Sequence, residues 1–133
     1  MREFSAGKAE KIGDYIVEFS FEKDIEIDER MSIEILSIIQ DLTFGKNHAL
    51  LYNFNKCNVL LSEIARKVSG VRNYNNSHLI ARALVSQSFT SNLESNYYIK
   101  NNKPSAETLL FQDRNKAIEW LTEKANHFLS QAK

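Results

Sequence analysis

The sequence contains few of the residues that cross-link a chain or interrupt its regular structure. It has one cysteine, one proline and four glycines among 133 residues. A single cysteine, Cys57, excludes an intrachain disulfide framework and a metal site built from several cysteines. The scarcity of glycine and proline argues against a long linker or a disordered segment. Since 43% of the residues are hydrophobic, the chain can form one domain with its own core.

Net charge and long apolar runs are also missing. The 17 basic and 17 acidic residues cancel, whereas a nucleic-acid-binding protein needs a clustered positive excess. No run approaches the roughly 18 apolar residues of a membrane span, and the N-terminal residues lack the apolar stretch of a signal peptide. We therefore expect a cytoplasmic protein without a nucleic-acid partner or a membrane span. A protein partner, including a second copy in a homodimer, is compatible with this composition.

The signatures of common catalytic and metal sites are absent. The sequence has no glycine-rich phosphate loop, nucleophile elbow, HExxH or CxxC motif. The three histidines, His48, His78 and His127, fall in three different predicted elements, whereas metal ligands usually cluster. We therefore predict a protein that is not an enzyme and needs no metal or cofactor, although an active site can be built on any fold.

What the sequence does contain is an alternation of strand and helix patterns. Period-two hydrophobicity from Asp14 to Ile27 predicts two antiparallel strands joined by a turn at residues 22–24. Helical spacing then predicts a helix that follows Asp28 and stops at Gly45. Further strands are predicted at residues 48–54, 79–85 and 107–111, and helices with apolar rows over 61–68, 89–97 and 117–128.

This alternation predicts an α/β fold with a mixed, mostly parallel sheet of four to five strands and about four helices. The segment from Leu50 to Phe54 is largely apolar on both faces, so we expect an interior strand. Trp120 lies beside the apolar row of the last predicted helix. Its size predicts that it packs at least partly against the sheet or the preceding strand.

The candidate site is the end of the central predicted strand, where the sequence reads LLYNFNKCNVLLSEI over residues 50–64. Ligands of open α/β sheets gather at the carboxyl ends of strands, but this end carries amides and no acid or base. We therefore predict a switch or partner surface formed by Asn53, Asn55, Asn58 and Ser62. The alternative is a pocket for a small apolar or lipid-like ligand, formed by Phe89, Leu93, Tyr97 and Tyr98.

Residues 102–121, NKPSAETLLFQDRNKAIEWL, resemble the last quarter of small bacterial STAS-like proteins. Those proteins have a similar N-K-P turn, an apolar strand ending in F-x-D or F-x-S, and a helix containing A-x-x-W-L. From about Tyr15 to Phe128 the chain is similar to this group, called SpoIIAA-like after the fold of anti-sigma-factor antagonists. It is more distantly similar to CRAL-TRIO lipid-binding domains. The resemblance implies a single STAS-like domain over residues 1–133, with its core at about 14–130.

The resemblance also implies a non-enzymatic regulatory or scaffolding domain that binds a protein partner. In the antagonists a D-[LF]-S triplet ends the central strand, and Asn53, Phe54 and Asn55 occupy its place here. A D-S-S-G-L motif opens the next helix, and residues 61–65 stand there with only Ser62 retained. The resemblance therefore implies a partner surface at Ser62 rather than a kinase-controlled switch. A carrier of a small apolar or lipid-like ligand is the alternative function.

Overall fold

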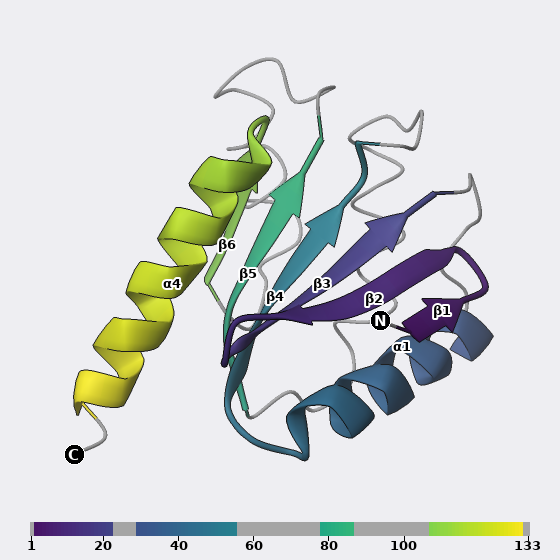
Figure 1. Cartoon of the computed structure of the whole chain (residues 1–133), viewed down its shortest axis with the longest axis horizontal. Helices are drawn as coiled ribbons and strands as arrows, with labels where there is room; N and C mark the ends of the chain where they lie inside the picture. The colour runs from purple at the N-terminus through teal and green to yellow at the C-terminus, as the bar shows by residue number, and fades with distance from the viewer. Residues whose placement is uncertain (1, 23–28, 56–77, 87–106, 132–133) are drawn as a thin grey trace.

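The computed structural model describes residues 2–22, 29–55, 78–86 and 107–131 (Figure 1). The elements are β1 (Arg2–Phe4), β2 (Gly7–Ile12), β3 (Ile16–Phe21), α1 (Glu29–Thr43), β4 (His48–Asn53), β5 (Leu79–Val85), β6 (Glu107–Phe111) and α4 (Arg114–Gln131). All the described strands belong to one six-stranded sheet, and their spatial order is the order of the sequence.

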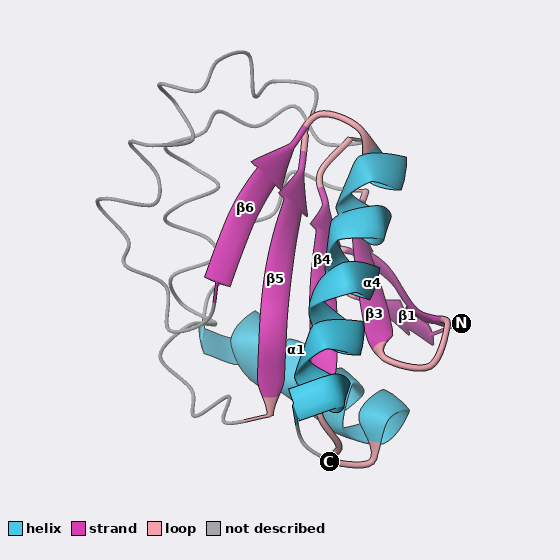
Figure 2. Ribbon diagram, turned by 90° about the vertical axis from the view of Figure 1, so that its left-hand side faces the viewer, coloured by secondary structure: helices cyan, strands magenta, loops and turns pink. Residues whose placement is uncertain are grey.

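The sheet is antiparallel at its N-terminal side and parallel beyond it. β1, β2 and β3 pair antiparallel, whereas β3, β4, β5 and β6 pair parallel. A tight turn can join antiparallel neighbours, but parallel neighbours need a crossover, and α1 provides the crossover from β3 to β4. α1 and α4 pack on opposite faces of the sheet (Figure 2). We call these the α1 face and the α4 face.

The fold class predicted from the sequence is wrong. The sheet has six strands rather than four or five, and its first three strands are antiparallel, unlike the mostly parallel STAS-like arrangement. The described residues contain two helices rather than four. The helices predicted around residues 61–68 and 89–97 lie outside the described part of the chain.

The N-terminal residues differ most from the prediction. They form a hairpin of β2 and β3 that turns at Gly13, which has a φ of 77°, and the strand predicted after residues 22–24 lies outside the described residues. No strand was expected at β2, because its buried positions are Gly7 and Ala9, which give almost no hydrophobic signal. A Cβ on Gly7 would lie 1.9 Å from the Ser20 carbonyl oxygen, so close strand approach requires glycine.

The other predicted elements that fall within the described residues are confirmed. β4 lies in the interior of the sheet, between β3 and β5, and β5 and β6 have the predicted bounds. α1 ends where Phe44 and Gly45 adopt φ values of 55° and 75°, a left-handed stop. The carboxylate of Asp113 accepts a hydrogen bond of 2.8 Å from the Asn115 N–H and so caps α4.

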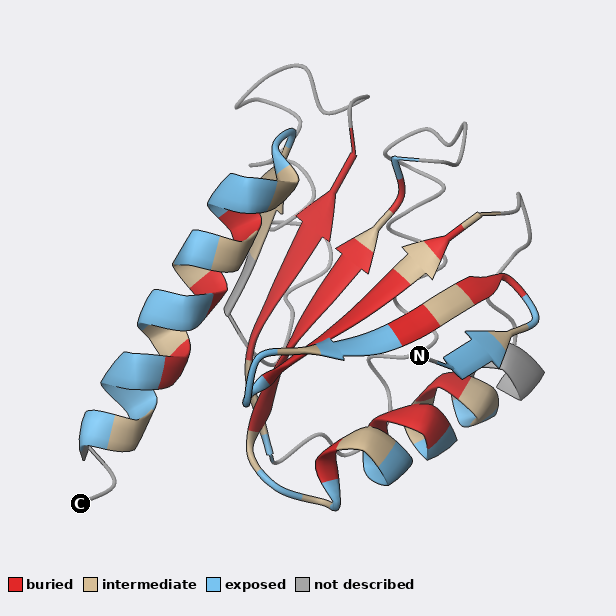
Figure 3. Cartoon of the chain, viewed as in Figure 1, coloured by how far each residue is buried: buried red, intermediate tan, exposed pale blue. Residues whose placement is uncertain are grey.

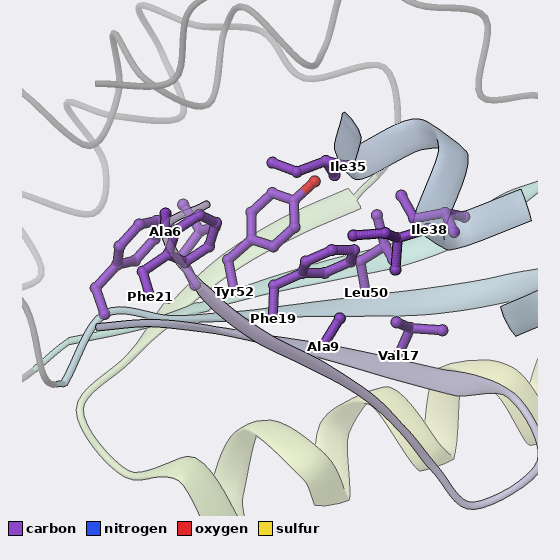
Figure 4. Close-up of a cluster of buried hydrophobic side chains, with 12 residues drawn as sticks. Ala6, Ala9, Val17, Phe19, Phe21, Ile35, Ile38, Leu50 and Tyr52 are labelled. Atoms are coloured by element: carbon purple, nitrogen blue, oxygen red, sulfur yellow. The ribbon is translucent and has the colours of Figure 1, made fainter. Parts of the chain in front are cut away.

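Aromatic side chains dominate the core on the α1 face. Phe19 and Tyr52 meet edge to face, with ring centroids 5.7 Å apart, and Phe21 makes the same type of contact with Tyr52 at 5.7 Å. Figure 4 shows these rings rising from the strands toward Ile35 and Ile38 of α1, with α4 on the other side of the sheet. Such pairs add stabilisation beyond the area that they bury.

Small side chains dominate the core on the α4 face. The buried members of this core are Ile16, Ala49, Leu51, Ala81, Ala83, Val85, Ala117 and Leu121. Figure 3 shows the buried stripe of α4 turned toward the sheet and its exposed stripe turned outward. Trp120 is half-buried and packs against Phe111 of β6, with ring centroids 5.7 Å apart. The predicted packing of Trp120 on the preceding strand is therefore confirmed.

Candidate functional site

The α4 face changes character from one half of the sheet to the other. α4 packs over β4, β5 and β6, where the sheet offers alanine, leucine and valine. On β2 and β3 the same face carries polar residues. Glu10 pairs with Glu18 and Lys8 pairs with Ser20 in the antiparallel register, and paired residues share a face. The border between these two halves lies along α4, and the candidate site is found there.

A buried carboxylate ties α4 to this border. Glu18 is only 6% exposed, and it accepts hydrogen bonds of 2.7 Å from both Nε and Nη2 of Arg114. The Asn53 amide donates a third hydrogen bond, of 3.1 Å, to Glu18. Since Arg114 is the first residue of α4, this network fixes the start of the helix against the middle of β3 and the end of β4.

The charge of Arg114 is stabilised by its surroundings. The hydrogen bonds that Arg114 donates to Glu18 raise the pKa of Arg114 above its ordinary value, and partial burial opposes this effect. The negative charges of Glu18 and Glu10 raise this pKa further. A bidentate arginine–carboxylate pair of this kind is geometrically specific as well as strong.

The structure places two of the predicted site residues at this network. The side-chain Oδ1 of Asn53 accepts a hydrogen bond of 2.9 Å from the backbone N–H of Asn55, which closes a local turn at the end of β4. Asn53 therefore uses both ends of its side chain. Asn58 and Ser62 lie outside the described residues, as do the predicted pocket residues Phe89, Leu93, Tyr97 and Tyr98.

A groove of about 420 Å³ extends from Arg114 along the side of α4. Its other wall is the β2–β3 hairpin. The residues that line the groove are Ile12, Gly13, Asp14, Tyr15, Ile16, Arg114, Ile118, Thr122, Ala125 and Asn126. Ile16 and Ala125 are buried and form apolar walls, whereas Asp14, Thr122 and Asn126 are exposed. The groove therefore has apolar walls and a polar rim.

The groove is long for its volume. Its lining on α4 runs from Arg114 to Asn126, which corresponds to roughly 18 Å at 1.5 Å per helical residue. Its ionisable side chains are Asp14, Tyr15 and Arg114, and Arg114 is already bound to Glu18. Within the described ranges, no group of three histidine, cysteine or acidic residues could hold a metal. The groove is therefore suited to binding by shape and apolar contact.

The sequence offered one unused signal for this site. Glu18 interrupts the otherwise apolar strand IVEFSF, and a charge in a buried strand usually indicates a partner of opposite charge. Its partner Arg114 lies 96 residues further along the chain, so element patterns alone could not identify the pair. The hairpin wall of the groove was missed because β2 was missed.

Comparison with known proteins gives one match. A family model described as "Domain of unknown function (DUF7793)" matches residues 11–125, a range that includes the hairpin wall of the groove and the α4 wall as far as Ala125. No curated protein and no solved structure matches the chain. Neither described helix is long and apolar enough to span a membrane.

Proposed function

We propose that this chain, which belongs to the domain-of-unknown-function family DUF7793, is a non-enzymatic protein-interaction domain. The groove beside α4 receives an extended segment of a partner protein. The observation that carries this proposal is the shape of the groove, which combines a length of roughly 18 Å along the helix with a volume of about 420 Å³. An extended segment rises about 3.3 Å per residue, so about five residues match the groove.

The walls and the rim indicate what such a segment contains. Ile12, Ile16 and Ile118 present apolar surface, which favours a segment with at least one large apolar side chain. The described charges of the hairpin and the start of α4 balance, since Glu10, Asp14 and Glu18 are matched by Lys8, Lys11 and Arg114. We therefore expect an apolar side chain, rather than a charge, to select the segment.

The proposed role is regulatory or scaffolding rather than catalytic. The groove offers apolar walls and one engaged ion pair, which suit binding. A chain of 133 residues with one cysteine relies on no intrachain disulfide, which supports a cytoplasmic location. The predicted partner surface at Asn58 and Ser62 stays a prediction, and Asn53 connects the strand end before it to the groove.

The second candidate is a carrier of a small apolar ligand that occupies the same groove. The observation in its favour is the volume, because about 420 Å³ lies within the range of small-molecule pockets. The open, elongated shape favours the peptide. Native mass spectrometry of the purified protein tests the carrier function directly, since a carried ligand would appear as a fixed added mass.

The peptide proposal is tested by panning a phage library of random heptapeptides on the folded protein. The blocking variant is Thr122→Arg, which adds a long cationic side chain to the exposed rim of the groove. The matched control is Ser130→Arg, which adds the same side chain to an exposed position of α4 outside the groove lining. Circular dichroism checks that both variants fold.

The expected result is a set of peptides that share at least one large apolar residue. These peptides should bind Thr122→Arg about tenfold more weakly than wild type, the scale of an interface hot spot. They should bind Ser130→Arg within about twofold, as for a neutral surface change. Equal binding to both variants would place the interaction elsewhere, and the absence of any enriched peptide would contradict the proposal.

A further inference from the structure

The α1 face contains a buried cation that the proposed function does not use. Arg82 of β5 is 1% exposed, and it is the largest fully buried side chain among the described residues. Two of its three guanidinium nitrogens, Nε and Nη1, are buried without a hydrogen-bond partner. A guanidinium always carries its charge, and a charge removed from water is costly unless it is paired.

The backbone directs Arg82 onto this face by a local irregularity. The parallel register of β4 and β5 shifts between His48 and Leu50, because His48 pairs with Leu79 and Leu50 pairs with Arg82. One extra residue in β5 is therefore accommodated at Ile80–Ala81. A β-bulge re-aims the side chains that follow it and is common beside functional sites. Here it turns Arg82 toward the same face as Leu50.

No described carboxylate of this face pairs with Arg82. The two described acidic residues of α1 that reach the sheet are engaged at its far edge. Asp41 pairs with Arg2, and Glu34 accepts hydrogen bonds from Ser5. Leu50 and Leu84 flank Arg82 on the same face and are both buried. The cation therefore lies among apolar side chains in this part of the chain.

We infer that Arg82 anchors a second binding site, which takes the carboxylate of a small organic acid with an apolar body. The carboxylate would supply the missing counter-charge and accept hydrogen bonds from the unpaired nitrogens, a strong charge-assisted arrangement. The apolar body would lie against the leucines that share the face. This site lies on the face of the sheet opposite the groove and does not depend on the proposed function.

His48 is a second buried side chain of this face that has a polar atom without a hydrogen-bond partner. Its Nδ1 lies 2.8 Å from the Lys46 carbonyl oxygen, so the neutral ring donates from Nδ1 and leaves Nε2 as an acceptor. Nε2 is buried without a partner. His48 lies two residues before Leu50 in β4, and Leu50 is the register partner of Arg82. The backbones of His48 and Arg82 are therefore roughly 8 Å apart. A polar group of the same ligand could reach it.

The test measures the binding of octanoate to delipidated full-length protein by calorimetry. Octanol is the uncharged probe of the same length, and acetate is the anion without an apolar body. Arg82→Met removes the charge at similar length, and Arg82→Lys keeps it. Arg2→Met is the matched control, because Arg2 is exposed and lies on the far edge of the sheet. Thr122→Arg reports any binding in the groove.

We expect octanoate to bind wild type and Arg2→Met equally, and Arg82→Met about tenfold or more weakly, because a charge-assisted bond is lost. Octanol and acetate should bind wild type at least about tenfold more weakly. Arg82→Lys should retain measurable binding, and Thr122→Arg should have no effect. Octanoate binding that survives in Arg82→Met, or that is lost in Thr122→Arg, would overturn the inference.

The stability of the ligand-free protein is the second test of the inference about Arg82. If the cation is unpaired, Arg82→Met should raise the urea midpoint of the delipidated protein, since an apolar replacement of an uncompensated charge stabilises a core. If a carboxylate of the chain itself already pairs with Arg82, the substitution would leave that carboxylate unpaired and lower the midpoint. A lower midpoint would therefore overturn the inference, whatever the binding data show.

Discussion

The cores on the two faces of the sheet are built from different kinds of side chain. On the α1 face, Phe19, Phe21 and Tyr52 fill the space between strands and helix with interlocked rings. On the α4 face, alanines of the strands meet Ala117 and Leu121 of the helix. Large rings give many contacts at one place, whereas small residues allow the helix backbone to lie close to the sheet.

This difference has a consequence for where a ligand can bind. Because α4 is held close over β4, β5 and β6, its flank and the β2–β3 hairpin form the two walls of a groove. The α1 face offers a different feature. It contains instead a single buried cation, Arg82. We therefore propose an open interaction on the α4 face and an enclosed one on the α1 face.

The largest expected effect comes from deleting a ring on the aromatic face. Phe19 is fully buried, so Phe19→Ala removes both its transfer free energy and its packing partners. The free energy of unfolding should fall by about 3–5 kcal/mol, measured by urea denaturation. Ile33→Ala is the control, because Ile33 of α1 is 54% exposed and should cost less than about 0.5 kcal/mol. A loss near that value for Phe19→Ala would contradict the description of this core.

A substitution that adds volume tests the α4 face, whose core consists mainly of small residues. Ala83 of β5 is fully buried in the core beneath α4, so Ala83→Leu adds volume where the helix lies closest. Overpacking should reduce the free energy of unfolding by about 1–3 kcal/mol. It should also weaken groove binding, because α4 must move to accommodate the larger side chain. A stable variant with unchanged peptide binding would show that the close approach of α4 does not shape the groove.

A smaller effect is expected from the ion pair that holds the start of α4. Glu18→Gln keeps the size of the side chain but removes the charge that binds Arg114. Arg114 retains access to water, since its side chain is 40% exposed, and the loss should therefore be near 1 kcal/mol. A double-mutant cycle with Arg114→Met measures the pair itself. A coupling energy close to zero would show that packing alone fixes this end of the helix.

The sequence predicted β4, β5, β6 and the two described helices better than it predicted the β2–β3 hairpin. β4, β5, β6 and both described helices have strong hydrophobic periods, and their positions follow from these periods alone. β2 has Gly7 and Ala9 at its buried positions, so its period was invisible, although it forms one wall of the groove. Asn53 was identified from its place at the end of a strand. The pairing of Glu18 with Arg114 depends on the three-dimensional approach of distant segments, which no local pattern encodes.

The smallest expected effect concerns the protonation of His48, whose ring is buried. Desolvation by burial lowers the pKa of His48 below 6.5, the hydrogen bond to the Lys46 carbonyl opposes this shift, and the charge of His78 adds to it. Between the folded value and 6.5, the unfolded chain therefore binds more protons than the folded protein. The free energy of unfolding should be constant above about pH 7.5 and should fall as the pH is lowered through 6.5. The slope stays below about 1.4 kcal/mol per pH unit, the limit for one proton.

The measurement is a series of urea unfolding curves between about pH 8 and pH 5.5, above the usual carboxylate range. His48→Gln removes the titrating ring and retains a donor for the Lys46 carbonyl, so this slope should disappear. His127→Gln is the control, because His127 lies on the exposed side of α4, and it should keep the slope of wild type. If His48→Gln retained the full slope, the acid sensitivity would belong to another group. Burial would then not disfavour the charged form of the His48 ring.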